Sequence, residues 1–176
     1  MHDNFDKGYA QIYTGDGKGK TTAAIGVTIR ALGAGMKVFF CQFMKNNFSS
    51  EQPVFDKYKD QLTLKQFGTG KFVFGKPSNE EVLAAKEGFQ LAKDAVNSGN
   101  YDLVVLDELN VAVSIGIVAE KDVLELIKNK PQRVEMILTG RGATDALKEA
   151  VHLVTEMREI KHYYKIGVPA RIGIEK

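Results

Sequence analysis

The chain has 176 residues, 44% of them hydrophobic, and its 24 basic and 22 acidic side chains leave a net charge of +2 at pH 7. This length fits one domain with a substantial core, and the apolar runs fall short of the roughly 18 residues that a membrane span needs. Because the basic residues are spread along the chain rather than massed in one block, no nucleic-acid partner is expected either.

Residues 1–7 form a short polar arm, and residues 8–176 are expected to form the single domain. The arm lacks the apolar core and the cleavage site of a signal peptide. The lone cysteine, Cys41, excludes an internal disulfide framework and lies in an apolar run typical of buried cysteines. These features predict a cytoplasmic protein.

A glycine-rich turn follows the first predicted strand, residues 9–13, and opens a helix predicted over residues 21–32. Glycines at positions 15, 17 and 19 let backbone N–H groups turn inward. Lys20 supplies a positive charge, and Thr21 offers a hydroxyl to a Mg²⁺ ion. The positive end of the helix dipole favours an anion at the same place. The turn therefore predicts a phosphate-binding loop.

A second strand is predicted over residues 37–43, which completes a βαβ unit. A polar, irregular region follows over residues 44–60, and then a short strand over residues 62–65.

The next loop, residues 68–77, is bounded by glycines and carries Phe72 and Phe74. Such a pair suits either a plug in the core or an aromatic clamp on a flat ligand. A capping-box spacing that starts at Ser78 then predicts a helix over residues 79–97.

Residues 102–107 form an apolar run without polar alternation, which predicts a central strand covered on both faces. The run ends at Asp107 and is followed by Glu108. Carboxylates at this strand end can hold Mg²⁺ directly or through water, opposite Thr21. Acidic residues also cap helices at such ends, and the phosphate loop favours the metal role.

The last elements predicted are a helix over residues 122–129, a strand over 134–139, a short helix over 144–150 and a terminal strand over 170–174. Strands that alternate with helices in this way predict a doubly wound α/β domain with a mostly parallel sheet. The functional loops then lie at the carboxyl ends of the strands.

Four further side chains are candidates with a structural alternative. Arg141, on a glycine-flanked turn after a strand, can reach phosphates or form a surface salt bridge. Arg30 can contact nucleotide or a neighbouring subunit, but its spacing is typical of an exposed helix arginine. Lys161 and His162 suggest a catalytic base, yet nothing in the sequence puts them near the loop, so a structural or interfacial role is favoured.

An ordered set of motifs resembles one family over nearly the whole chain, from Gly8 to Glu175. The family is that of the P-loop ATP:corrinoid adenosyltransferases, which have a RecA-like P-loop NTPase fold. The motifs lie in residues 14–24, 104–110, 138–143, 153–157, 161–162 and 173–175.

The resemblance implies transfer of the 5′-deoxyadenosyl group of ATP to the cobalt of a reduced corrinoid, with release of triphosphate. In the family ATP lies reversed in its loop, so that the ribose 5′-carbon faces the nucleophile. That pose suits the irregular loop here, where Thr14 stands at the position of the first glycine in the common G-x-x-x-x-G-K-[ST] pattern. A homodimer is also implied, with an electron-donating flavoprotein or ferredoxin as a candidate partner.

By motif position, Lys20 and Arg141 would act on the phosphates, and Thr21, Glu108 and Asp107 would hold Mg²⁺. ATP and corrinoid would contact a larger set: Gly15, Asp16, Gly17, Lys18, Gly19, Lys20, Thr21, Thr22, Arg30, Phe72 and Phe74. Asp16 replaces an asparagine of many members. The aromatic corrinoid loop reads Gly-Lys-Phe-Val-Phe in a chain without tryptophan, where some members have Gly-Phe-Thr-Trp.

Two other functions use the same motifs. A P-loop kinase or phosphohydrolase would direct attack at the terminal phosphorus and yield ADP. A nucleotide-gated binding module would use ATP to order residues 44–77 for a protein partner, without turnover.

Overall fold

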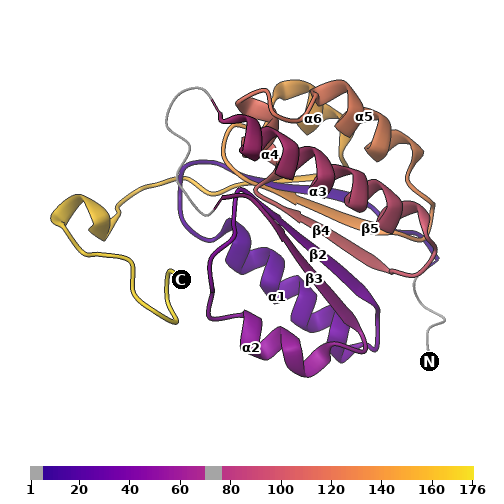
Figure 1. The fold of residues 1–176 in the computed structure, drawn as a ribbon, viewed down its shortest axis with the longest axis horizontal. Coiled ribbons are helices and arrows are strands. Elements are labelled where there is room, and N and C mark those ends of the chain that lie inside the picture. Colours follow the sequence, from indigo (N-terminus) through magenta and orange to yellow (C-terminus); the bar gives the residue numbers. More distant parts are fainter. Residues whose placement is uncertain (1–5, 70–76) are drawn as a thin grey trace.

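The computed structural model describes residues 6–69 and 77–176, in which six parallel strands form one sheet (Figure 1). The strand order is β3-β2-β4-β5-β1-β6, and every neighbouring pair is parallel. The strands are β1 (Ala10–Thr14), β2 (Val38–Phe43), β3 (Leu62–Phe67), β4 (Leu103–Asp107), β5 (Glu135–Thr139) and β6 (Leu153–Glu156).

Helices cover both faces of this sheet, as the doubly wound prediction requires. In Figure 1, α1 and α2 lie on one side of the strands, and α3 to α6 lie on the other. The helices are α1 (Lys20–Gly33), α2 (Gln52–Phe55), α3 (Asn79–Asn97), α4 (Leu109–Ser114), α5 (Glu120–Asn129) and α6 (Asp145–Ala150), with 3₁₀ turns at Asp56–Tyr58 and Tyr163–Ile166. Within the described residues, no helix combines the length and the apolar character that a membrane crossing requires.

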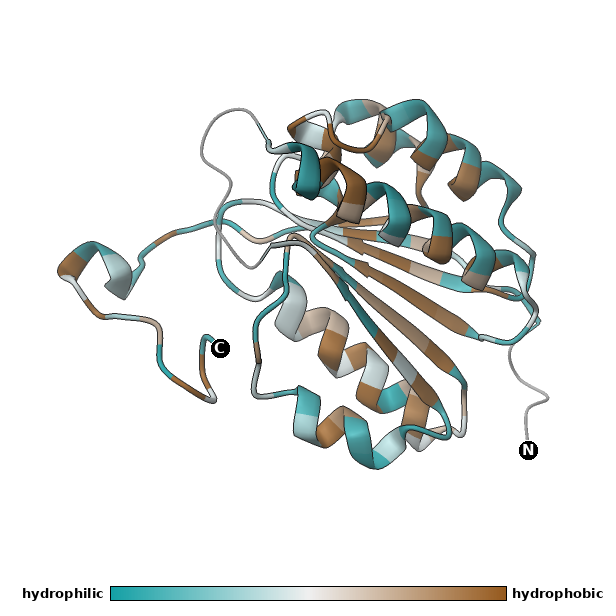
Figure 2. Cartoon of the chain, in the orientation of Figure 1, coloured by the Kyte–Doolittle hydropathy of each residue, from teal (hydrophilic) through white to brown (hydrophobic). Residues whose placement is uncertain are grey.

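Two buried apolar clusters fill the spaces between the sheet and its helices. One contains residues of α3, α4 and α5, and the other contains residues of α1. Figure 2 shows the strands as largely hydrophobic, while the helices carry hydrophilic residues on their outer sides. The alternation of strand side chains between the two faces therefore supplies both clusters from the same sheet.

Strand β4 lies in the interior of the sheet, as its unbroken apolar run predicted. All five of its residues are buried, and it pairs with β2 on one side and β5 on the other. This position directs the carboxyl end of β4, with Asp107, to the middle of one sheet edge.

The start of α3 confirms the capping-box prediction. The backbone N–H of Glu81 donates to Ser78 Oγ at 3.3 Å, and the backbone N–H of Ser78 donates to Glu81 Oε2 at 2.7 Å. The helix runs over residues 79–97, as predicted.

Two other predictions differ from the structure, and one helix was missed. The terminal strand over residues 170–174 is wrong: this segment is a series of turns, with Gly173 at a left-handed φ of 79°, and the sixth strand is β6, which pairs with β1. The region 44–60 is not wholly irregular, because it contains α2 and a 3₁₀ turn. Helix α4, directly after Glu108, was not predicted.

Leu106 offers a test of the β4 core. It is fully buried beside Cys41 and Leu138, so Leu106→Ala should lower the free energy of unfolding by about 2–5 kcal/mol. Urea denaturation would measure this change. The same substitution at Leu83, which is 67% exposed on α3, should change stability by less than about 0.5 kcal/mol. Equal effects at the two positions would contradict the assignment of β4 to the core.

Candidate nucleotide site

Three strand ends meet where the sequence predicted the site. The glycine-rich loop links β1 to α1, Asp107 ends β4, and the turn with Arg141 follows β5. Strands β4, β5 and β1 are neighbours in the sheet, and all run in the same direction. Their carboxyl ends therefore form one edge, which is the usual ligand-binding position in open α/β sheets.

Lys20 is the first residue of α1 and is only 7% exposed. Its Nζ donates to the carbonyl oxygens of Gly15 and Gly17, both at 2.7 Å. An ammonium group has three N–H donors, so these two bonds hold the turn of the loop and leave one donor for a phosphate. Burial lowers the pKa of Lys20, while the nearby Glu108 carboxylate favours the charged form.

The glycines of the loop also lie against the chain that follows β6. A Cβ at Gly15 or Gly17 would come within 2.5 or 2.7 Å of the Met157 carbonyl oxygen. The Gly17 N–H donates to that oxygen at 2.7 Å. Close packing is therefore a second reason for glycine at these positions. Donation by the Gly17 amide to a phosphate stays a prediction.

Asp107 is 1% exposed and accepts hydrogen bonds from three different elements. Its Oδ1 accepts from Thr21 Oγ1 at 2.8 Å and from Thr139 Oγ1 at 2.6 Å. Its Oδ2 accepts from Gln42 Nε2 at 3.2 Å. Burial raises the pKa of the carboxyl group, and these three hydrogen bonds act in the opposite direction.

The sequence reasoning missed Gln42 and Thr139 as parts of this site. Both are fully buried polar residues that follow apolar residues in their strands, and Thr139 is the last residue of β5. A single polar side chain near the carboxyl end of a buried parallel strand is the signal that would have identified them.

Glu108 follows with a left-handed backbone, φ 62°, and its N–H donates to Thr139 Oγ1 at 3.0 Å. Within the described part of the chain, its carboxylate has no hydrogen bond or ion pair. Burial and the neighbouring Asp107 charge raise the pKa of Glu108 to about 7, although Lys20 and Arg141 favour the ionised form. A bound cation would compensate the negative charge of this carboxylate, which burial and Asp107 disfavour.

The oxygen atoms at this edge suit Mg²⁺. Within residues 6–69 and 77–176, no group of three or more His, Cys, Asp or Glu side chains is placed to hold a metal ion. Mg²⁺ does not need such a cage, because proteins usually hold it with one or two carboxylates and with oxygens of the substrate phosphates. Glu108, Asp107 and the Thr21 hydroxyl provide donors of this kind.

Arg141 contacts the phosphate loop, and its action on the phosphates stays a prediction. Its Nη2 donates to the carbonyl oxygen of Asp16 at 3.3 Å. In contrast, Arg30 lies in the exposed last turn of α1, ten residues and therefore about 15 Å along the helix from Lys20. Its role as a nucleotide contact stays a prediction, and Phe72 and Phe74 lie outside the described residues.

Lys161 and His162 lie closer to the loop than the sequence indicated. They line a hollow of about 310 Å³ together with Gly17 and Lys18 of the loop. The His162 Nδ1 accepts from the Tyr164 N–H at 3.0 Å and so caps the 3₁₀ turn. This bond gives His162 a structural role, as favoured above.

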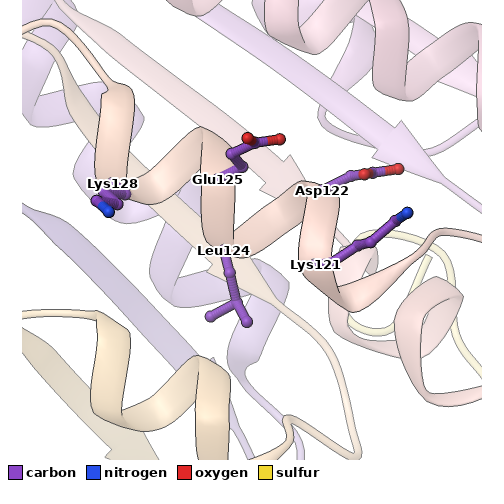
Figure 3. Close-up of a pocket in the computed structure, with 5 residues that line it drawn as sticks. All are labelled: Lys121, Asp122, Leu124, Glu125 and Lys128. Carbon is purple, nitrogen blue, oxygen red and sulfur yellow. The ribbon is translucent and has the colours of Figure 1, made fainter.

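A second hollow, of about 470 Å³, lies over α5 (Figure 3). Its five lining residues all come from that helix: Lys121, Asp122, Leu124, Glu125 and Lys128. In Figure 3, Leu124 points away from Glu125 and Asp122. Because its lining comes from one helix and not from the ends of several strands, this hollow is a weaker candidate for the nucleotide site than the phosphate loop.

Thr139 provides a test of the Asp107 network. Thr139→Val keeps the shape but removes the donor to Asp107 and the acceptor for the Glu108 N–H. We expect a loss of about 1–3 kcal/mol in stability. We also expect MgATP to bind roughly tenfold more weakly, as when an outer-shell partner is removed from a metal site. Denaturation and calorimetric titration would measure both, with the exposed Thr155→Val as control. Unchanged affinity would contradict the role of Asp107 in positioning Thr21.

The comparisons with known proteins agree with this geometry. The family model described as ATP:corrinoid adenosyltransferase BtuR/CobO/CobP matches residues 6–175. The corrinoid adenosyltransferase of Pseudomonas aeruginosa is 34% identical over 171 residues, which cover 97% of this chain and 84% of that protein. The corrinoid adenosyltransferase of Escherichia coli K12 is 33% identical over 172 residues, which cover 97% and 86%.

Among solved structures, a KaiC-like protein from the hyperthermophilic archaeon Pyrococcus horikoshii OT3 has a TM-score of 0.53 at 19% identity. The likeness covers 85% of this chain and 73% of that one, and it concerns the fold alone. The fold alone does not identify a family. The family model does, because its match spans the phosphate loop, Asp107, Glu108 and the closing residues. The chain belongs to the family of ATP:corrinoid adenosyltransferases.

Proposed function

We propose that this protein transfers the 5′-deoxyadenosyl group of ATP to the Co(I) of a reduced corrinoid, in adenosylcobalamin synthesis or salvage. The electron pair of Co(I) attacks the ribose 5′-carbon and forms the cobalt–carbon bond. The bond between that carbon and its oxygen breaks, and triphosphate leaves with the electron pair. The match to the adenosyltransferase family over residues 6–175 is the observation that carries this proposal.

The protein need not remove a proton in this reaction, because Co(I) is already a strong nucleophile. Its tasks are to align the attack and to stabilise the charge on the leaving triphosphate. Lys20 and Arg141 supply positive charge at the loop, and backbone N–H groups of the loop can bind phosphate oxygens. Mg²⁺, held by Thr21, Glu108 and Asp107, would neutralise part of the phosphate charge.

Phosphoryl transfer is the competing enzymatic function, since the same fold and the same loop serve it. The hydrogen-bond pattern of Asp107 argues against a role as catalytic base. Both of its oxygens already accept hydrogen bonds, and Thr21 occupies one of them. Family membership favours adenosyl transfer over this alternative.

A homodimer and an electron-donating flavoprotein or ferredoxin are further parts of the proposal. Large apolar side chains are exposed on the edge strand β6 and on the segment after it, which supports association with a protein surface. They include Leu153, Val154, Ile160, Tyr164, Ile166 and Ile172.

We also propose that residues 8–176 act as one domain, and that Phe72 or Phe74 contacts the lower face of the corrinoid.

The proposed reaction predicts an unusual phosphate product. Anaerobic incubation with MgATP and chemically reduced cob(I)alamin should give a light-sensitive alkyl-cobalt product and triphosphate in equal amounts. The loss of Co(I) absorption and anion-exchange analysis of the phosphates would measure them. Conversion of ATP to ADP with the corrinoid unchanged would contradict adenosyl transfer and support the phosphoryl-transfer alternative.

Glu108→Gln should separate the metal role from folding. The amide keeps the size of the side chain but removes the charge that we assign to Mg²⁺, so the turnover rate should fall about 100-fold or more. The Mg²⁺ concentration needed for half-maximal rate should also rise. Glu87→Gln, on the exposed side of α3, should leave both quantities unchanged. A Glu108→Gln enzyme with normal turnover and normal Mg²⁺ dependence would remove this residue from the metal site.

A further inference from the structure

The carboxyl-terminal segment, residues 163–176, returns to the phosphate loop after leaving the sheet. We call this segment the strap. In Figure 1 the chain leaves the end of β6, turns at the second 3₁₀ turn and folds back, so that its terminus lies near the start of α1. The strap has no strand and packs no residue into the buried core. Neither sheet pairing nor core packing therefore explains why it contacts the loop.

Lys18, at the outer side of the loop, is held by the end of the strap. Its Nζ donates to the Ile174 carbonyl oxygen at 3.1 Å and to Glu175 Oε1 at 3.2 Å. It also donates to the Tyr163 hydroxyl at 3.4 Å, so all three partners of the ammonium group lie in the strap. The charge of Lys18 is directed to Glu175, whereas the Lys20 ammonium lies within the loop.

Glu175 is fixed in turn by the strap itself. Arg171 donates to it from its backbone N–H at 2.8 Å and from Nη2 at 3.0 Å, and the Tyr163 hydroxyl also donates to it. The Arg171 guanidinium lies 5.0 Å from the centre of the Tyr163 ring. Arg171, and then Tyr163, hold the pKa of Glu175 well below its usual range, so the carboxylate is ionised at neutral pH. The acceptor for Lys18 is thus charged and held by Arg171 and Tyr163.

The strap has a second attachment, at Ser50 in the segment between β2 and α2. The Gly173 N–H donates to Ser50 Oγ at 3.0 Å, and Ser50 Oγ donates to the Lys176 carbonyl oxygen at 2.7 Å. The next residue, Glu51, accepts from Gln42 Nε2, the same amide that donates to Asp107. The strap therefore joins the phosphate loop to the segment that supports the buried carboxylate.

We propose that the strap holds the phosphate loop in its nucleotide-binding shape, and that Glu175 is the positioning residue that does this by fixing Lys18. Glu175 acts through Lys18 and does not touch the nucleotide. The inference rests on the proposed function only in that the loop binds the phosphates of ATP. It gives the closing motif, residues 173–175, a task that the reaction itself does not require.

A double-mutant cycle tests the pair. Glu175→Gln and Lys18→Met should each weaken MgATP binding about fivefold, a modest effect because the ion pair is partly exposed. The double variant should bind no more weakly than the weaker single variant, because both changes remove the same contact. Isothermal titration of the full-length proteins would measure the dissociation constants. Lys18→Arg, which keeps the ion pair, should recover part of the affinity that Lys18→Met loses.

Two further readouts separate positioning from a general loss of structure. Hydrogen exchange at the strap amides, including that of Gly173, should become faster in both single variants. The KM for ATP should rise while kcat stays within about twofold, whereas partial unfolding would lower kcat and leave KM unchanged. Glu149→Gln and Lys86→Met, both at exposed helix positions, are matched controls and should change none of these quantities.

Several results would overturn the proposal. Normal MgATP affinity in Glu175→Gln would exclude Glu175 as a positioning residue. A double variant whose loss equals the product of the two single losses would show that Glu175 does not act through Lys18. These two binding measurements use MgATP without a corrinoid, whereas the KM and kcat comparison needs the full reaction. A failure of adenosyl transfer would therefore leave the strap proposal standing, and a failure of the strap would leave the reaction standing.

Discussion

The buried carboxylate of Asp107 is the constraint on which the nucleotide site depends. Removing an ionised carboxylate from water is strongly unfavourable unless hydrogen bonds compensate it. Here the donors come from α1, β2 and β5, so the carboxylate is stable only if these three elements meet at the end of β4. The same requirement fixes the Thr21 hydroxyl at the start of α1, where the phosphate loop ends.

The phosphate loop is held from two sides, and this arrangement suits catalysis by preorganised charge. On its inner side, Thr21 contacts Asp107 and the Lys20 ammonium closes the turn. On its outer side, Gly17 donates to Met157 and Lys18 contacts the strap. Donors that are already fixed before the leaving group develops its charge need little reorganisation during the reaction. A loop held from one side only would lose part of this advantage.

The sequence predicted those parts of the fold and site that have a local signal. Residues 102–107 read as a central strand because no polar residue interrupts them, and the loop was found from its glycines and Lys20. Gln42 and Thr139 were missed because their roles depend on which strands become neighbours, and strand order is not a local property. The residues 170–174 were assigned wrongly for a related reason. Their apolar spacing resembles a strand, but the Arg171–Glu175 ion pair and the left-handed Gly173 curl the backbone into turns.

The division of labour between the two adjacent carboxylates follows from their surroundings. Asp107 accepts three hydrogen bonds from neighbouring side chains, whereas Glu108 has no hydrogen bond among the described residues and faces Lys20 and Arg141. An enzyme that activates a hydroxyl or a water would need one of these groups as a base. A Co(I) nucleophile carries no proton to remove. A site whose two carboxylates position Thr21 and attract a cation is therefore sufficient for adenosyl transfer, because the remaining requirement is positive charge around the departing triphosphate.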